Sequence, residues 1–127
     1  MPHVVLERVP SLETLEAHLP SGPSRWGRAV LRSTGVWLRR EPPGALVEGV
    51  VVELQRPLHP VAILAPRKGN LAVRLWPPVP VERTPAVQRW LAEVAAAASR
   101  AGAGRVVTTN LSPELLEGLF GAGGDGS

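Results

Sequence analysis

The side chains that most often bind metals or perform catalysis are sparse in this chain and far apart in the sequence. The histidines are His3, His18 and His59. They share no metal-ligand spacing, although Glu7, Glu48 or Glu53 would supply a carboxylate if folding brought them together. The only aspartate is Asp125, and there is no cysteine, which excludes disulfides, thiolate zinc sites and cysteine nucleophiles. The sequence therefore predicts no metal site and no cofactor.

Phosphate-binding signatures are also missing. The Walker phosphate loop and the Gly-x-Gly-x-x-Gly fingerprint do not occur. Gly102-Ala103-Gly104 precedes an apolar strand pattern instead of opening a helix, so we interpret it as a turn between a helix and a strand. Nucleotide-cofactor chemistry is not indicated.

Basic residues gather in the middle of the chain. The net charge is +3, and residues 25–76 hold nine basic residues against three glutamates. The candidates for binding a nucleic acid are Arg28, Arg32, Arg39, Arg40, Arg67 and Lys68. Arg28 and Arg32 are expected to share one strand face, and Trp37 and Arg39 another, where arginines would hold phosphates and tryptophan would stack on bases. The preferred alternative is a solvated sheet face whose arginines block edge-to-edge aggregation.

The N-terminus offers one route to catalysis. Removal of Met1 would expose the secondary amine of Pro2, which acts as a general base where its surroundings lower its pKa. Met1-Pro2-His3 followed by an apolar strand resembles the start of 5-carboxymethyl-2-hydroxymuconate isomerases of the tautomerase superfamily. The resemblance covers about eight residues and implies that Pro2 would shuttle a proton while arginines bind substrate carboxylates. The sequence assigns that arginine to no single position.

The surrounding pattern predicts short strands, then helices. Strands are expected at 3–9, 28–32, 36–40, 46–54, 61–65, 71–76 and 105–109, and helices at 12–19, 84–101 and 112–120. Ser33-Thr34-Gly35 predicts a hairpin turn, and residues 66–70 predict a second one. Thr84, Pro85 and Gly102 provide start and stop signals for the longest helix, whose stripe includes Trp90.

These elements predict one α+β domain over residues 1–120 and a flexible Gly-rich tail at 121–127. The order is strand–helix, a largely antiparallel meander of about five strands, then helix–strand–helix, with the helices on one face of a curved mixed sheet. Hydrophobic residues make up 44% and charged residues 20% of the chain, an ordinary globular balance. The low Asn, Gln and Met content and the many prolines suit a thermophile, whereas a GC-rich genome would produce the Arg, Ala, Gly and Pro bias without any thermal meaning.

The sequence favours a cytoplasmic, non-enzymatic binding or assembly domain with no membrane partner and no ligand that can be named. Self-association is expected, with Trp76 as the interface candidate because it ends a strand beside Pro77. The nucleic-acid module and the Pro2-dependent enzyme are the two alternatives.

Overall fold

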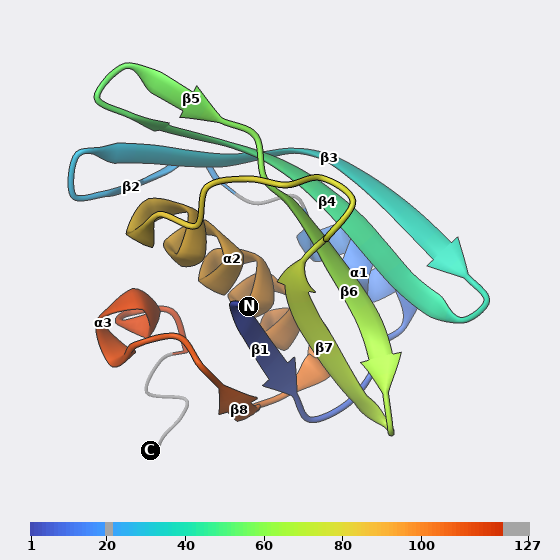
Figure 1. Cartoon of the computed structure of the whole chain (residues 1–127). Coiled ribbons are helices and arrows are strands. Elements are labelled where there is room, and N and C mark those ends of the chain that lie inside the picture. The colour runs from blue at the N-terminus through green and yellow to red at the C-terminus, as the bar shows by residue number, and fades with distance from the viewer. Residues whose placement is uncertain (20–21, 121–127) are drawn as a thin grey trace.

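The computed structural model describes residues 1–19 and 22–120. Its elements follow one another along the chain as shown in Figure 1. They are β1 (His3–Leu6), α1 (Leu12–His18), β2 (Ser24–Trp26), β3 (Ala29–Arg40), β4 (Pro43–Glu53), β5 (Arg56–Leu58), β6 (Val61–Arg67), β7 (Asn70–Leu75), α2 (Pro85–Ala98), a π-helical turn (Ser99–Ala103), β8 (Val106–Thr109) and α3 (Pro113–Leu116). The predicted tail at 121–127 lies outside the described residues.

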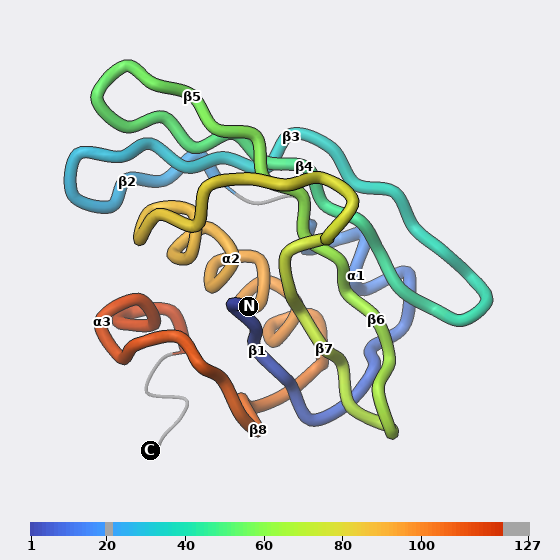
Figure 2. Tube along the Cα trace, in the orientation of Figure 1, coloured from blue at the N-terminus to red at the C-terminus, as the bar shows by residue number. Residues whose placement is uncertain are grey.

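The strands form one curled sheet in the order β2-β3-β4-β6-β7-β1-β8, with β5 pairing the end of β4. Every strand pair within the described ranges is antiparallel, so the mixed sheet that the sequence suggested is wrong in that detail. In Figure 2, the first strand, β1, lies between β7 and β8, which come much later in the chain, so β1 joins β8 to the rest of the sheet. The α+β class and the curved sheet are confirmed.

The helices cover one face of this sheet, which we call the inner face (Figure 1). In α2, Val87, Trp90, Leu91 and Val94 are all buried, because they recur at helical spacing on one side. They pack against alternate strand residues such as Val47 and Leu64. Thr84 accepts a hydrogen bond from the Val87 amide at 3.1 Å, which confirms the predicted start of the helix.

The predicted hairpin turn at Ser33-Thr34-Gly35 is wrong. These residues lie inside β3, which pairs with β4 from Val30 to Arg40. A bulge between Ser33 and Gly35 absorbs one extra residue, and the turn that precedes β3 falls instead at Gly27-Arg28. The long pairing with the valine-rich β4 thus overrides the local turn signal.

Other observed element boundaries also differ from the predicted ones. The three-residue strands β2 and β5 were not predicted, so the meander has six strands where about five were expected. The first strand ends at Leu6 instead of residue 9, and the helix predicted for 112–120 is a single turn, Pro113–Leu116. The β6–β7 hairpin is confirmed, with pairing that continues to Arg67 and Asn70. No helix in the described part of the chain is long and apolar enough to cross a lipid bilayer.

Candidate binding face of the sheet

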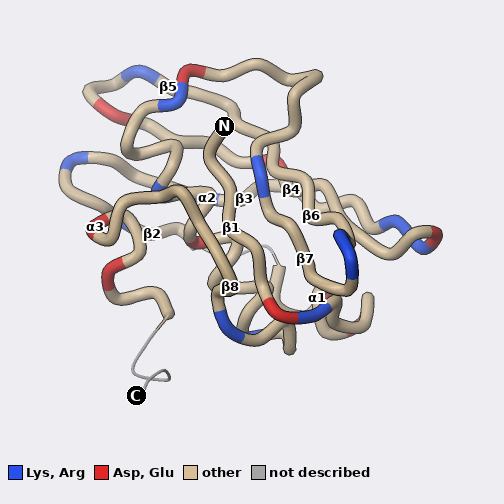
Figure 3. Tube along the Cα trace, turned by 60° about the horizontal axis from the view of Figure 1, so that its bottom comes forward, with Lys and Arg blue, Asp and Glu red and all other residues tan. Residues whose placement is uncertain are grey.

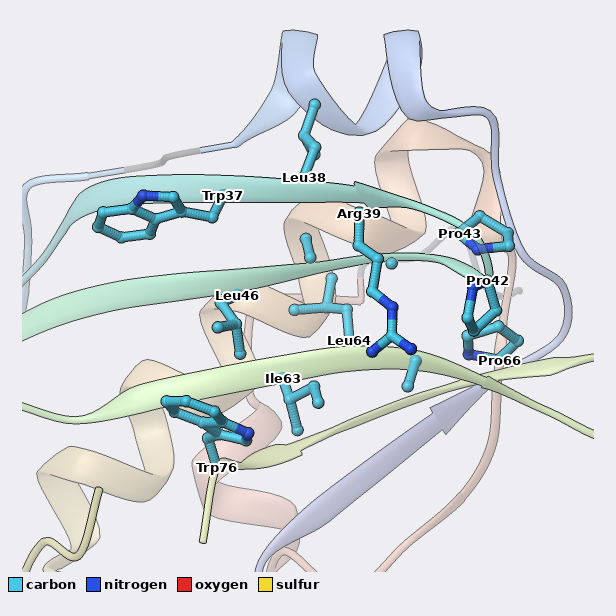
Figure 4. A pocket seen from close by; sticks show the side chains of 13 residues that line it. Trp37, Leu38, Arg39, Pro42, Pro43, Leu46, Ile63, Leu64, Pro66 and Trp76 are labelled. Atoms are coloured by element: carbon cyan, nitrogen blue, oxygen red, sulfur yellow. The ribbon is translucent and has the colours of Figure 1, made fainter. Parts of the chain in front are cut away.

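The face of the sheet turned away from α1 and α2, here called the outer face, carries an apolar groove (Figure 4). It follows β3, β4 and β6 and has a volume of about 260 Å³. Its walls are Trp37, Leu46, Ile63 and Trp76, and Arg39 extends over it. Pro42, Pro43 and Pro66 close one end. A second hollow of about 300 Å³, bordered by Val30, Arg32 and Val52, lies further along β3 and β4.

Strand pairing explains why these side chains meet. Trp37 lies opposite Leu46 and Leu46 lies opposite Ile63, so a row of apolar side chains crosses three strands. The next row across the strands combines Arg39 with two small residues, Gly44 and Ala65. Gly44 is required there, because a Cβ would collide with the backbone carbonyl of Leu64. Large side chains next to small ones produce the groove.

Trp37 lies flat against its own strand. A Cβ added to Gly35 would come within 3.0 Å of the Trp37 ring, so the indole covers the space above this glycine. The bulge at Thr34 places Gly35 and Trp37 on the same face of β3. Trp37 remains 54% exposed, which leaves the other side of the ring open to solvent. An aromatic ring in this position is suited to stacking against another flat group.

Three arginines lie on the same outer face as this ring. By strand pairing, Arg32 lies opposite Val50, Arg39 opposite Gly44, and Arg74 opposite Ile63. The ion pairs formed among the described residues involve other side chains, and none includes these three arginines. Arg39 donates one weak hydrogen bond, from Nε to the carbonyl of Glu41 at 3.4 Å. The guanidinium groups therefore remain available to an anion.

The predicted basic residues are not all on this face. Arg32 and Arg39 are, but Arg28 lies in the β2–β3 turn and Lys68 in the β6–β7 turn, at different places on the sheet. Figure 3 shows Lys and Arg positions at several strands and turns along the chain. The predicted strand that joined Arg28 and Arg32 on one face is therefore wrong, because β3 begins at Ala29.

Two remaining predicted cations, Arg40 and Arg67, end β3 and β6 respectively. Both are exposed, and Arg67 lies opposite Asn70 beside the turn. Sequence reasoning did not single out Arg74, Leu46, Ile63 or Gly35 as site residues. The alternation of β7, β4 and β6 was the available signal for the first three, but the bulge that turns Gly35 to the outer face left no signal.

The tryptophans occupy three different environments. Trp90 is buried, as predicted, and its Nε1 donates to Ser33 Oγ at 3.2 Å. Trp76, the predicted interface residue, is half-buried in the groove wall. Trp37 is the most exposed of the four tryptophans. The strand-end position had suggested Trp76 instead.

Pro2 is buried at the start of β1. The side chain of Asn110 holds the chain on both sides of it: Nδ2 donates to the Met1 carbonyl at 2.7 Å, and Oδ1 accepts from the His3 amide at 2.9 Å. A proline amine that serves as a general base must be reached by its substrate. With Met1 in place the Pro2 nitrogen belongs to a peptide bond, so the tautomerase-like reaction stays a prediction that requires removal of Met1.

The histidines remain apart from one another. His3 Nδ1 contacts the Met1 carbonyl at 3.1 Å, and His18 Nδ1 contacts the Thr14 carbonyl at 2.8 Å. His59 is exposed and borders a separate shallow hollow with Glu48 and Thr34. Within residues 1–19 and 22–120, no three His, Asp or Glu side chains come together as a metal site would require.

No family model, curated protein or solved structure matches this chain.

Proposed function

We propose that this chain is a non-enzymatic binding domain that holds single-stranded nucleic acid on the outer face of its sheet. The observation that supports this most directly is the flat, half-exposed indole of Trp37 between the unpaired guanidinium groups of Arg32 and Arg39. Proteins that bind single strands combine aromatic platforms for the bases with cations for the phosphates. Both components are present on one face here.

The groove extends the platform beyond a single ring. Trp76 and Trp37 stand on opposite sides of Leu46 and Ile63 (Figure 4), so a second base has an aromatic contact across the groove. Along β3, Arg32 and Arg39 are about 20 Å apart at ~3.3 Å per strand residue. An extended strand of a few nucleotides spans that length.

The outer face, with its exposed indole, favours single strands over duplexes. In a duplex the flat faces of the bases are stacked inside the helix and cannot reach Trp37. A duplex would contact only the arginines, which lie several residues apart, and binding would be the weak, salt-sensitive kind that any cation supplies. A nucleic-acid partner is consistent with the cytoplasmic location that we expected from the cysteine-free composition.

Fluorescence anisotropy with labelled single-stranded DNA, single-stranded RNA and the matching duplexes tests this proposal. The expected result is binding of single strands that weakens with salt, persists near physiological salt, and exceeds binding of the duplex. Flat titrations near physiological salt for all four probes would overturn the proposal. Equal binding of duplex and single strand would also overturn it, because stacking on Trp37 would then contribute nothing.

Two matched variants separate the outer face from the rest of the molecule. Arg39→Ala removes a cation from the groove, whereas Arg100→Ala removes an exposed cation that follows α2 and belongs to none of the ion pairs given above. Only the first variant is expected to weaken binding. Similar losses for both would indicate a general effect of net charge instead of a site.

A further inference from the structure

The second half of β3 has a free edge. On one side, β3 pairs with β4 along most of its length. On the other side, β2 pairs only with residues Ala29–Leu31 of β3. Within the described part of the chain, no strand pairs with this side of residues 36–40. Figure 1 shows the β3–β4 hairpin projecting from the body of the sheet at this point.

Exposed apolar side chains lie on both faces of the sheet at this edge, beside Arg39 and Arg40. Trp37 points to the outer face and is 54% exposed, while Leu38 points to the other side and is 36% exposed. Leu38 lies on the same face as Leu31, which is buried, and Val36, which is partly buried against the core. A free edge with exposed apolar side chains is a template for pairing with another strand.

We infer that a second copy of this chain occupies the edge, with the two β3 strands antiparallel and Leu38 of each copy opposite Leu38 of the other. The pairing is isologous, because the same segment is used on both sides of a two-fold axis. The two leucines then cover each other, and the sheet continues from one copy into the next. This inference does not rest on the nucleic-acid proposal, because the unpaired backbone edge of β3 and Leu38 support it, although Trp37 and Arg39 would contribute to both surfaces.

The residues on either side of Leu38 fit this register. Trp37 of one copy falls opposite Arg39 of the other, and the reverse pair forms on the opposite side of the axis. Cross-strand neighbours have Cβ atoms about 5 Å apart, so the flexible arginine side chain can bring its guanidinium to within ~6 Å of the indole ring centroid, the range of a cation–π contact. Val36 falls opposite Arg40, whose alkyl part can pack on it. A pairing centred on Arg39 instead would place two arginines opposite each other, which is unfavourable.

The two proposals respond to salt in opposite ways. Two copies of a chain with net charge +3 repel each other, and salt screens this repulsion. Dimerisation is therefore expected to strengthen as salt increases. Binding of a nucleic acid weakens with salt, because counterions compete for the phosphates. Failure of one proposal is thus distinguishable from failure of the other.

The absence of natural cysteine permits a direct test of the register. Opposed residues of antiparallel strands have Cα atoms about 4.5–5.5 Å apart, inside the range of about 4.4–6.8 Å that a disulfide requires. Under mild oxidation, Leu38→Cys is expected to form a covalent dimer about ten-fold faster than Val107→Cys, since only the first thiol is held against its partner. Val107 is a suitable control because it is 54% exposed and lies on β8, at the other end of the sheet.

The unmodified chain is measured alongside by sedimentation velocity over a range of concentrations and salt. The expected result is a monomer–dimer equilibrium that shifts toward dimer with salt, and a monomer for Leu38→Lys with an unchanged circular dichroism spectrum. The inference is overturned if the unmodified chain stays monomeric at the highest concentrations reached. It is also overturned if Leu38→Cys cross-links no faster than Val107→Cys, or more slowly than Trp37→Cys.

Discussion

The indole of Trp90 packs directly against the backbone of Gly49, with no room for a side chain between them. Gly49 faces inward from β4, and Trp90 comes from the middle of α2, so this contact sets how closely the helix approaches the sheet. Ser33, the strand neighbour of Gly49, accepts the hydrogen bond from the Trp90 indole. The lack of a side chain at Gly49 thus makes room for Trp90, the largest fully buried side chain in the described part of the chain.

Gly49→Ala is expected to destabilise the fold. The added Cβ would overlap the Trp90 ring, and overpacking of this kind costs about 1–3 kcal/mol, or more where neither element can shift. Urea denaturation measures the loss. Gly69→Ala is the control, because Gly69 has open space around it and only its positive φ of 85° opposes a side chain. The control is expected to lose about 1–2 kcal/mol, the cost of a side chain at positive φ, and a loss at Gly49 no larger than the loss at Gly69 would argue against the packing explanation.

Thr84→Ala is expected to lower the free energy of unfolding by about 1 kcal/mol, because the amide of Val87 loses its hydrogen-bond acceptor at the start of α2. The matched substitution is Ser112→Ala at the start of α3, where the serine makes no side-chain capping bond. Thermal unfolding of the two variants checks the difference. A larger loss at Ser112 than at Thr84 would contradict the assignment.

Trp37→Ala is expected to weaken binding of single-stranded nucleic acid by about 1–3 kcal/mol, the usual contribution of one stacked base. Stability is expected to change little, because the ring is more than half exposed. Leu54→Ala, on the β4–β5 turn, is the control for loss of an exposed apolar side chain, since Leu54 is 74% exposed. Unchanged affinity in Trp37→Ala would remove the stacking platform from the proposal.

Gly35→Ala tests whether the orientation of the Trp37 indole affects binding. A methyl group at this position reaches the space that the Trp37 ring covers, so the indole must tilt away from the strand. Affinity for single strands is expected to fall while the charge stays the same. Tryptophan fluorescence of the free protein is expected to shift, and an unaltered spectrum with unaltered affinity would show that the ring orientation has no role.

Part of this fold was predictable because local sequence and final environment agree. Thr84-Pro85 begins a helix, the apolar stripe through Trp90 faces the core, and the β6–β7 hairpin forms where turn residues separate two apolar runs. At Ser33-Thr34-Gly35 they disagree. The residues resemble a turn, but pairing with β4 holds them in a bulged strand, and no local rule predicts which influence prevails.

The sequence by itself determined the class of fold, the longest helix, α2, and the exclusion of thiol chemistry, because these depend on composition and on periodicity within a single segment. Only the tertiary structure decided which side chains form the outer face. One extra residue at Thr34 changes which way every later residue of β3 points, and so it places Arg32, Trp37 and Arg39 together on the face that the helices leave uncovered. A side chain's exposure in a sheet depends on which face other elements cover, and that is set by contacts between segments far apart in the chain.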